Sequence, residues 1–209
     1  MDDNNSYINS IIDSYEKDLK NAQRTLKEQY NDEYSCLETI KFQTIEICLA
    51  AVKSFGLQLE FVKDKTLEII LAAVNTYGCA LEYVEEQTPE IVLAALRNDG
   101  CALRHVINQT YANILVAVKQ NGLALKYAKR QKHAHTLASV KENGYALLYV
   151  IKQTRDICIA ALQQEEDSFQ YIRDPNMKLQ IVLELFDKYK HLDYSSKEIQ
   201  FCIARMKEL

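Results

Sequence analysis

The stretch TPEIVLAALRNDG, residues 88–100, reads as one complete helix with a signal at each end. Thr88 can cap the helix through its hydroxyl, Pro89 suits the first helical position, and Glu90 places a negative charge where the helix dipole is positive. Gly100 stands where helices commonly end in a left-handed residue. The six apolar residues IVLAAL between these signals indicate a helix that is covered by neighbours on most of its sides.

The glycines show where those neighbours lie in the sequence. The chain has five of them, and each follows the last after 22 residues: Gly56, Gly78, Gly100, Gly122 and Gly144. So strict a period is typical of a repeat array. The same step reaches back to Tyr34 and forward to Glu166, so about seven units fit into residues 34–187.

Each unit reads roughly G-x-A-L-x-Y-V-x-x-Q-T-x-E-I-x-L-A-A-V, followed by three variable residues. This pattern predicts a short apolar turn of helix, a connector that ends in Thr, and a longer helix. Leucine-rich repeats share the period, but their L-x-x-L-x-L strand and asparagine ladder are missing. Paired alanines favour helix and allow helices to pack closely. The expected fold is therefore all-α, an α-solenoid of about seven 22-residue two-helix repeats.

The two ends of the array are expected to be capped by further helices. Residues 1–33 carry an apolar seam with alternating steps of four and three residues, Ile8, Ile12, Tyr15, Leu19, Ala22 and Leu26,. This helix can cover the first repeat, or it can form a coiled-coil dimer; three heptads are few for a dimer, so the cap, and with it a monomer, is favoured. Residues 188–209, with SSKEIQFCIARM, predict a C-terminal cap. The whole is expected to form a single domain.

Composition indicates a cytoplasmic protein. Of the 209 residues, 48% are hydrophobic, yet no apolar run is long enough to span a bilayer, and no signal peptide precedes the array,. The six cysteines form no C-x-x-C pair and occupy small or apolar columns of the repeat, where reduced thiols fit. We therefore expect a reducing compartment and no membrane contact.

Units such as NGLALKYAKRQ and EIVLAALRNDGCAL resemble the short helical repeats of a family of unknown function, abundant in giant DNA viruses of amoebae and in some intracellular bacteria. The resemblance covers roughly residues 34–184. It implies a scaffold that acts inside a host cell, for example in its cytosol. The family motif contains no catalytic or ligand-binding residues that can be transferred to this chain.

The charge distribution departs most clearly from the repeat. Residues 1–99 hold 9 Lys and Arg against 18 Asp and Glu, residues 100–152 hold 8 against 1, and residues 153–209 hold 8 against 10. A net charge of −4 therefore hides a basic middle between acidic ends,. Repeat proteins usually place recognition in the variable columns of a constant frame, so the basic middle is the candidate site.

One column shows the change of sign directly. The residue after the repeated Leu is Glu38, Glu60 and Glu82 in the first units, and it is Arg104 and Lys126 in the next two. The candidate partner-binding residues are these two basic residues and their neighbours in nearby columns: Arg104, His105, Lys126, Lys129, Arg130, Lys132, His133 and Lys152. A solvated face that only keeps the protein soluble is the competing interpretation of the same residues.

The unit with QKHAHTLASV is the least regular, because Lys132 replaces the capping Thr and His135 replaces an apolar Ile. This predicts a locally weakened helix, either at a functional surface or by drift of the repeat. His133 and His135 are two residues apart and point to different sides of a helix, so they predict no metal site.

The sequence predicts no enzyme and no cofactor. It has no H-E-x-x-H, no G-x-S-x-G and no phosphate-binding glycine loop, and the repeat itself uses every glycine,. The expected function is a non-catalytic scaffold that binds a protein with an acidic surface through residues 100–152. Two alternatives stay open: a nucleic-acid-binding helical repeat protein, and a structural protein that associates with itself through its acidic and basic parts.

Overall fold

The computed structural model describes residues 13, 14, 17, 20, 37, 38, 40–193 and 195–208. They divide into two compact parts, each of several repeats: residues 1–108, called the first unit from here on, and residues 109–209, called the second unit. The two units are described separately. Every regular element of the described residues is a helix, so the predicted all-α helical repeat fold is confirmed. The expected capping helix at 1–33 falls almost wholly outside the described residues.

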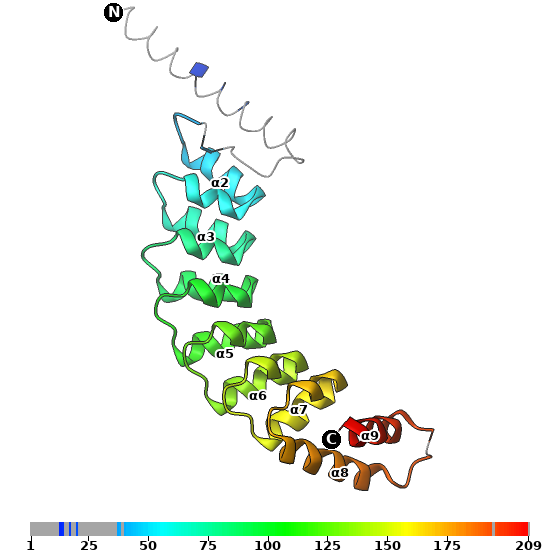
Figure 1. Ribbon diagram of the computed structural model, residues 1–209. Coiled ribbons are helices and arrows are strands. Elements are labelled where there is room, and N and C mark those ends of the chain that lie inside the picture. The colour runs from blue at the N-terminus through cyan, green and yellow to red at the C-terminus, as the bar shows by residue number, and fades with distance from the viewer. Residues whose placement is uncertain are drawn as a thin grey trace, which may run out of the picture. The chain divides into compact units, whose positions relative to one another are not determined.

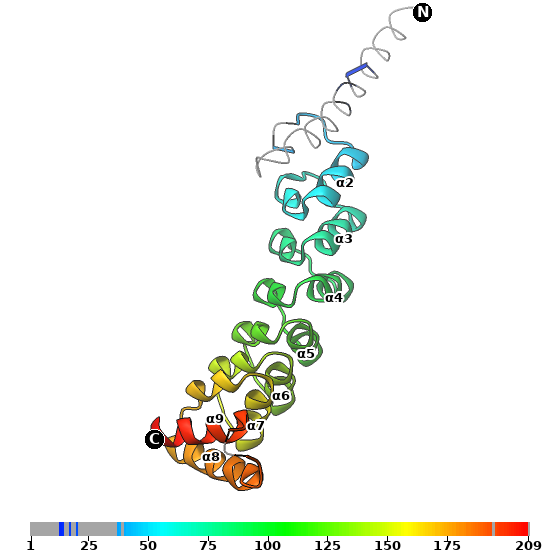
Figure 2. The ribbon, with the colours of Figure 1, turned by 90° about the vertical axis from the view of Figure 1, so that its right-hand side faces the viewer.

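In the first unit, long helices alternate with six-residue 3₁₀ helices (Figure 1). The order is α2 (Ile45–Ser54), η1 (Gly56–Phe61), α3 (Leu67–Thr76), η2 (Gly78–Tyr83), α4 (Pro89–Asn98) and η3 (Gly100–His105). The long helices pack on one another in sequence order, and the 3₁₀ helices form a parallel row beside them (Figure 2). The predicted short turn of helix is thus a 3₁₀ helix.

The second unit repeats this arrangement and then closes it. Its elements are α5 (Tyr111–Gln120), η4 (Gly122–Tyr127), α6 (His133–Glu142), η5 (Gly144–Tyr149), α7 (Arg155–Gln164), η6 (Glu166–Tyr171), α8 (Pro175–Tyr189) and α9 (Lys197–Glu208). Helix α8 is longer than its counterparts and continues past residue 187. Helix α9 packs on α8 and is the last helix that SSKEIQFCIARM predicted.

The helix starts are as the sequence predicted. Thr88 is the N-cap of α4, its hydroxyl accepts the backbone N–H of Ile91 at 3.4 Å, and Pro89 follows at the first position. Equivalent caps come from Thr44, Thr66 and Thr110. The core lies between the rows, where the repeated Leu of each 3₁₀ helix is fully buried, as Leu81 and Leu125 show. Burying such a side chain contributes about 1.5–3 kcal/mol.

The expected left-handed glycine cap is wrong. Helix α4 ends at Asn98, its C-cap Asp99 is extended with φ −142°, and Gly100 is the first residue of the right-handed helix η3. The repeated glycines Gly56, Gly78, Gly122 and Gly144 likewise lie outside the left-handed region.

Close packing of each 3₁₀ helix against the long helix that follows it explains these glycines instead. A Cβ on Gly78 would lie 2.5 Å from the carbonyl oxygen of Ala95 on α4, and one on Gly122 would lie 2.5 Å from that of Ser139 on α6. Distances under about 3 Å to a backbone oxygen are not tolerated, so the column needs a residue without a side chain. The glycine and alanine columns are therefore two sides of one contact, repeated along each unit.

Candidate partner-binding surface

Glutamine side chains in most of the described connectors join one repeat to the next. The Nε2 of Gln87 donates to the carbonyl of His105 at 2.8 Å, and its Oε1 accepts the N–H of Ile107 at 3.0 Å. Four other glutamines make the same pair of bonds to residues 18 and 20 positions later, namely Gln43, Gln109, Gln131 and Gln153. This ladder fixes the backbone of the connectors that carry most of the candidate residues.

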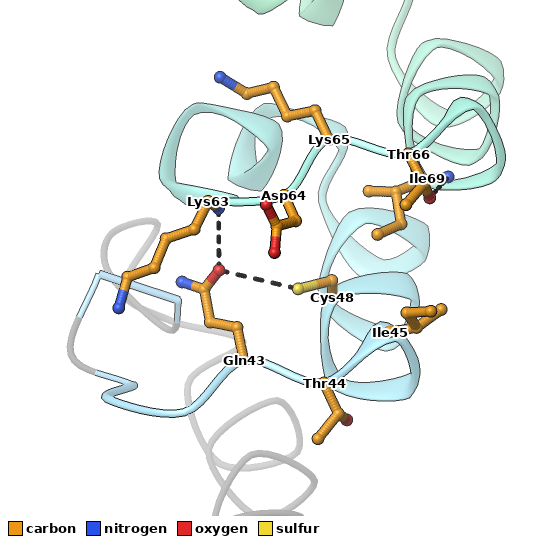
Figure 3. A pocket seen from close by; sticks show the side chains of 9 residues that line it. All are labelled: Gln43, Thr44, Ile45, Cys48, Lys63, Asp64, Lys65, Thr66 and Ile69. Atoms are coloured by element: carbon orange, nitrogen blue, oxygen red, sulfur yellow. Dashed lines mark hydrogen bonds between the residues drawn. The ribbon is translucent and has the colours of Figure 1, made fainter.

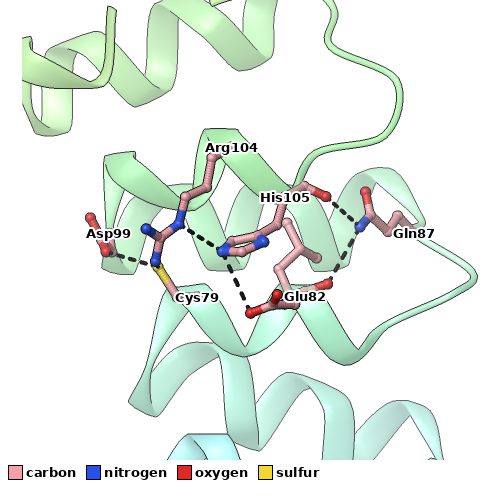
Figure 4. Close-up of polar contacts among 7 residues, drawn as sticks. Cys79, Glu82, Gln87, Asp99, Arg104 and His105 are labelled. Atoms are coloured by element: carbon pink, nitrogen blue, oxygen red, sulfur yellow. Dashed lines mark hydrogen bonds and ion pairs between the residues drawn. The ribbon is translucent and has the colours of Figure 1, made fainter. Parts of the chain in front are cut away.

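Arg104 and His105 belong to the first unit and are engaged within it (Figure 4). The guanidinium of Arg104 donates through Nε to His105 Nε2 at 2.7 Å and through Nη2 to the sulfur of Cys79 at 3.3 Å. The His105 side chain is 14% exposed and lies 4.0 Å from the carboxylate of Glu82. Burial lowers the pKa of His105, so the ring is neutral near pH 7,.

The thiol of Cys79 completes this cluster and donates to Asp99 Oδ2 at 3.4 Å. Burial, followed by the hydrogen bond to Asp99, raises its pKa, so it is not a reactive thiolate despite the nearby guanidinium,. Arg104 and His105 therefore hold η3 to η2 in addition to any part in binding.

The other six candidates belong to the second unit and lie on η4, on the connectors and at the start of α6. Lys126 lies over the ring of Tyr127, with Nζ 4.6 Å from the centroid, and Lys132 lies over the ring of Tyr111 at 5.3 Å. Gln109 Oε1 accepts the backbone N–H of Lys129 at 2.9 Å. Lys126, Lys129, Arg130, Lys132 and Lys152 are all exposed at their side chains.

A groove of about 250 Å³ lies where the start of α6 faces the next connector. The structure brings together Lys132, His133 and Lys152 here; the remaining lining residues are Gln131, Thr136, Ile151, Thr154 and Ile157. Among the described residues that line the groove there is no carboxylate. This groove, called the basic groove below, is a cationic recess with apolar walls.

His133 is paired at the rim of the basic groove. Its Nε2 lies 2.7 Å from Oδ2 of Asp156, and the other oxygen of that carboxylate accepts the hydroxyl of Thr154. The Thr154 hydroxyl, followed by His133, lowers the pKa of Asp156. The two oxygens of the rim carboxylate are therefore each engaged by a protein group.

The first unit has the same groove 88 residues earlier, four repeats away in sequence (Figure 3). This groove has a volume of about 480 Å³ and is lined by Gln43, Thr44, Ile45, Cys48, Lys63, Asp64, Lys65, Thr66 and Ile69. Asp64 stands at the position of Lys152, and Lys63 stands at the position of Ile151. A constant frame therefore presents a mixed charge in the first unit and a purely cationic lining in the second.

His135 does not belong to this surface. It is 2% exposed, its ring packs on Tyr111 with centroids 4.4 Å apart, and its Nε2 lies 3.2 Å from the Tyr111 carbonyl. Its Nδ1 accepts the backbone N–H of Lys132 at 3.4 Å. The ring thus stabilises the start of α6, where Lys132 replaces the capping threonine. Burial lowers the pKa of His135. The expected weakening is thus partly offset inside the core.

Two apolar residues beside the basic groove were missed in the sequence. Ile151 is 71% exposed and Leu148 is 45% exposed. Their backbone carbonyls accept Arg173 Nη1 at 3.3 Å and Nη2 at 3.1 Å, respectively. A signal was present, because Ile107 and Ile151 are the two apolar residues in a column that is charged at Lys63, Glu85, Lys129 and Arg173.

Metal and membrane sites are not supported by the described residues. They contain no group of three or more His, Cys, Asp or Glu side chains able to hold a metal ion. Among these same residues, no helix combines the length and the apolar character needed to cross a membrane.

Comparison with known proteins finds a family similarity in part of the chain. Residues 44–87 and 66–109 each match the model of a family described as Domain of unknown function (DUF4116). Each match covers two repeats, and the second begins 22 residues after the first, at the next capping threonine. No curated protein and no solved structure matched the chain.

Proposed function

We propose that the protein is a non-catalytic scaffold that binds a protein with an acidic surface through the connectors of its second unit. The basic groove carries this proposal: Lys132 and Lys152 line it, no carboxylate is among its described lining residues, and the carboxylate at its rim is paired with His133. Complementary charge guides association and selects partners. Recognition then resides in variable columns on a frame that the glutamine ladder keeps rigid.

Two features favour a protein over a nucleic acid. Ile151, next to Lys152 on the connector, and Leu148, on η5, expose apolar side chains, which can pack on a protein partner but gain little from a phosphate backbone,. The repeated tyrosines are half-buried, and Tyr127 already lies under Lys126, so they offer little ring surface for stacked bases,. Nucleic acid and self-association remain the alternatives to test.

The test compares three defined probes on the full chain. We expect a labelled 20-residue peptide rich in Asp and Glu to bind with a higher affinity than a 20-nucleotide RNA or a DNA duplex, measured by fluorescence anisotropy from 50 to 300 mM salt. Replacing Arg130, Lys132 and Lys152 with Glu should abolish peptide binding. The matched control replaces Lys41, Lys63 and Lys65 of the first unit with Glu and should leave it intact.

Each alternative has its own signature in the same experiment. Tighter RNA binding with a steep salt dependence would replace the protein partner with nucleic acid. Concentration-dependent mass that disappears at high salt, measured by light scattering, would indicate self-association. Equal loss of peptide binding in both triple variants would mean that net charge, not the second unit, governs binding.

We further propose that the protein works in a reducing compartment, in the cytoplasm or in the cytosol of a host cell. No two of the described cysteines form a disulfide, and burial raises the pKa of Cys158 to about 11. A protonated, buried thiol resists oxidation. Titration of accessible thiols before and after unfolding tests this proposal.

A further inference from the structure

We infer that the basic groove and its column accept an extended acidic peptide that places one apolar side chain on Ile151. This inference rests on the proposed function and specifies its ligand. The groove volume of about 250 Å³ is smaller than a typical small-molecule pocket,. It suits one side chain with the backbone on either side of it.

The walls of the groove supply the charge that such a ligand needs. Lys132, the N-cap residue of α6, and Lys152, on the next connector, both line the groove. The described residues that line the groove include no carboxylate, so a carboxylate that enters lies beside two ammonium groups, while Asp156 at the rim is held by His133 and Thr154. Lysine ammonium groups bind carboxylates as charge-assisted donors.

The apolar contact is fixed in place before a ligand arrives. Gln131 Oε1 accepts the N–H of Ile151 at 2.9 Å, and Arg173 Nη1 donates to the carbonyl of Ile151 at 3.3 Å. With both backbone groups held, the backbone of Ile151 is fixed where its side chain is exposed. A preformed contact of this kind costs little ordering on binding.

The spacing of the column sets the spacing of the peptide. Lys129, Ile151 and Arg173 occupy equivalent positions in three successive repeats of the second unit. Packed helices lie ~8–10 Å apart, and an extended chain advances ~3.3 Å per residue, so neighbouring repeats match positions about three residues apart. The expected ligand therefore reads acidic-x-x-apolar-x-x-acidic, with the guanidinium of Arg173 using its remaining donors on the last carboxylate.

Selection from a random heptapeptide phage library on the full chain tests this ligand without assuming its sequence. The enriched peptides should carry an apolar residue with Asp or Glu three positions before and after it. Synthetic versions should lose at least tenfold in affinity when their central residue becomes Ser. Enriched peptides without this pattern, or no enrichment above a blank surface, would overturn the inference.

Variants of the groove separate this inference from the proposed function. Lys152→Asp and Ile151→Lys copy Asp64 and Lys63 of the first unit, and each should weaken a selected peptide at least tenfold. The control Lys63→Glu, which changes the net charge by the same two units as Lys152→Asp, should change affinity less than twofold. If the acidic 20-residue peptide still needs Arg130, Lys132 and Lys152 while Ile151→Lys has no effect on the heptapeptide, the scaffold function stands and the groove inference fails.

Discussion

The Nε2 of Gln131 donates to the carbonyl of Tyr149 at 2.9 Å, which joins residues 18 positions apart across two repeats of the second unit. Its Oε1 accepts the N–H of Ile151 at the same distance. One side chain thus satisfies two backbone groups at the place where η5 ends. The connectors of this solenoid are therefore ordered by side chains as well as by the apolar core.

Removing one glutamine of the ladder should destabilise the protein. Gln131→Ala leaves a part-buried carbonyl and a backbone N–H without their side-chain partner, and each lost bond costs about 1 kcal/mol,. We expect a loss of about 2 kcal/mol in the free energy of unfolding, measured by urea denaturation. Gln164→Ala, at the exposed end of α7, is the control and should change it by less than about 0.5 kcal/mol,.

The repeat that lacks this glutamine can be repaired. Lys65 stands in the glutamine column and is exposed, whereas Gln43 and Gln87 on either side are half-buried. In Lys65→Gln the new amide can bond to the backbone of residues 83 and 85, as the other glutamines do at their own spacing. We expect a gain of about 1 kcal/mol on urea denaturation. An unchanged or lower midpoint would show that the connector of this repeat differs in geometry.

The sign of the stability change caused by a glycine substitution distinguishes two explanations of the repeated glycines. If Gly122 served only backbone freedom in a right-handed region, Gly122→Ala would stabilise the protein by about 0.4–1 kcal/mol. The structure predicts the opposite sign, because the new Cβ would lie 2.5 Å from the Ser139 carbonyl. We expect a loss of about 1–3 kcal/mol, measured by thermal and urea unfolding. A stabilised variant would contradict the packing explanation.

The parts of the fold visible in the sequence are those encoded within one repeat. Thr88, Pro89 and the apolar run after them are local signals, and each acts as predicted. Gly78 and Gln87 act through contacts with atoms that lie almost one repeat length further along the chain. The repeat period can be read in the sequence, but these contacts in space cannot. Gly100 was misread for this reason, since a glycine after a helix has a common local explanation.

The candidate site shows the same division. The change of sign along the chain pointed to Lys132, His133 and Lys152, and the structure brings these three together in one groove. It could not reveal that Arg104 contacts Cys79 and His105, because that contact crosses from η3 to η2. Nor could composition distinguish the exposed Ile151 from the buried Ile157.

The buried histidine of α6 should make stability depend on pH. Burial lowers the pKa of His135 in the folded protein below its ordinary value of about 6.5,. The unfolded chain then binds more protons, so this contribution is complete above pH 6.5 and is lost as the pH falls below it. In His135→Ile, the residue of other repeats, the loss of unfolding free energy between pH 7.5 and 5.5 should be smaller than in the wild type. His105 shifts in the same direction and leaves a residual slope.

An exposed histidine provides the control for that titration. His191 is exposed and follows α8, so His191→Gln should leave the pH dependence of unfolding as it is in the wild type. Urea denaturation at half-unit pH intervals measures all three proteins. Parallel curves for His135→Ile and the wild type would show that the imidazole is accessible to protons in the folded state.

The most direct test of binding at the basic groove is an NMR titration of the ¹⁵N-labelled full chain with the peptide Glu-Ser-Gly-Leu-Ser-Gly-Glu, blocked at both ends. The amide signals of residues 129–133 and 148–154 should shift most and saturate together, with Lys152→Asp suppressing the change. Equal or larger shifts at residues 41–45 and 63–66, or shifts that Lys152→Asp leaves intact, would contradict recognition by the basic groove.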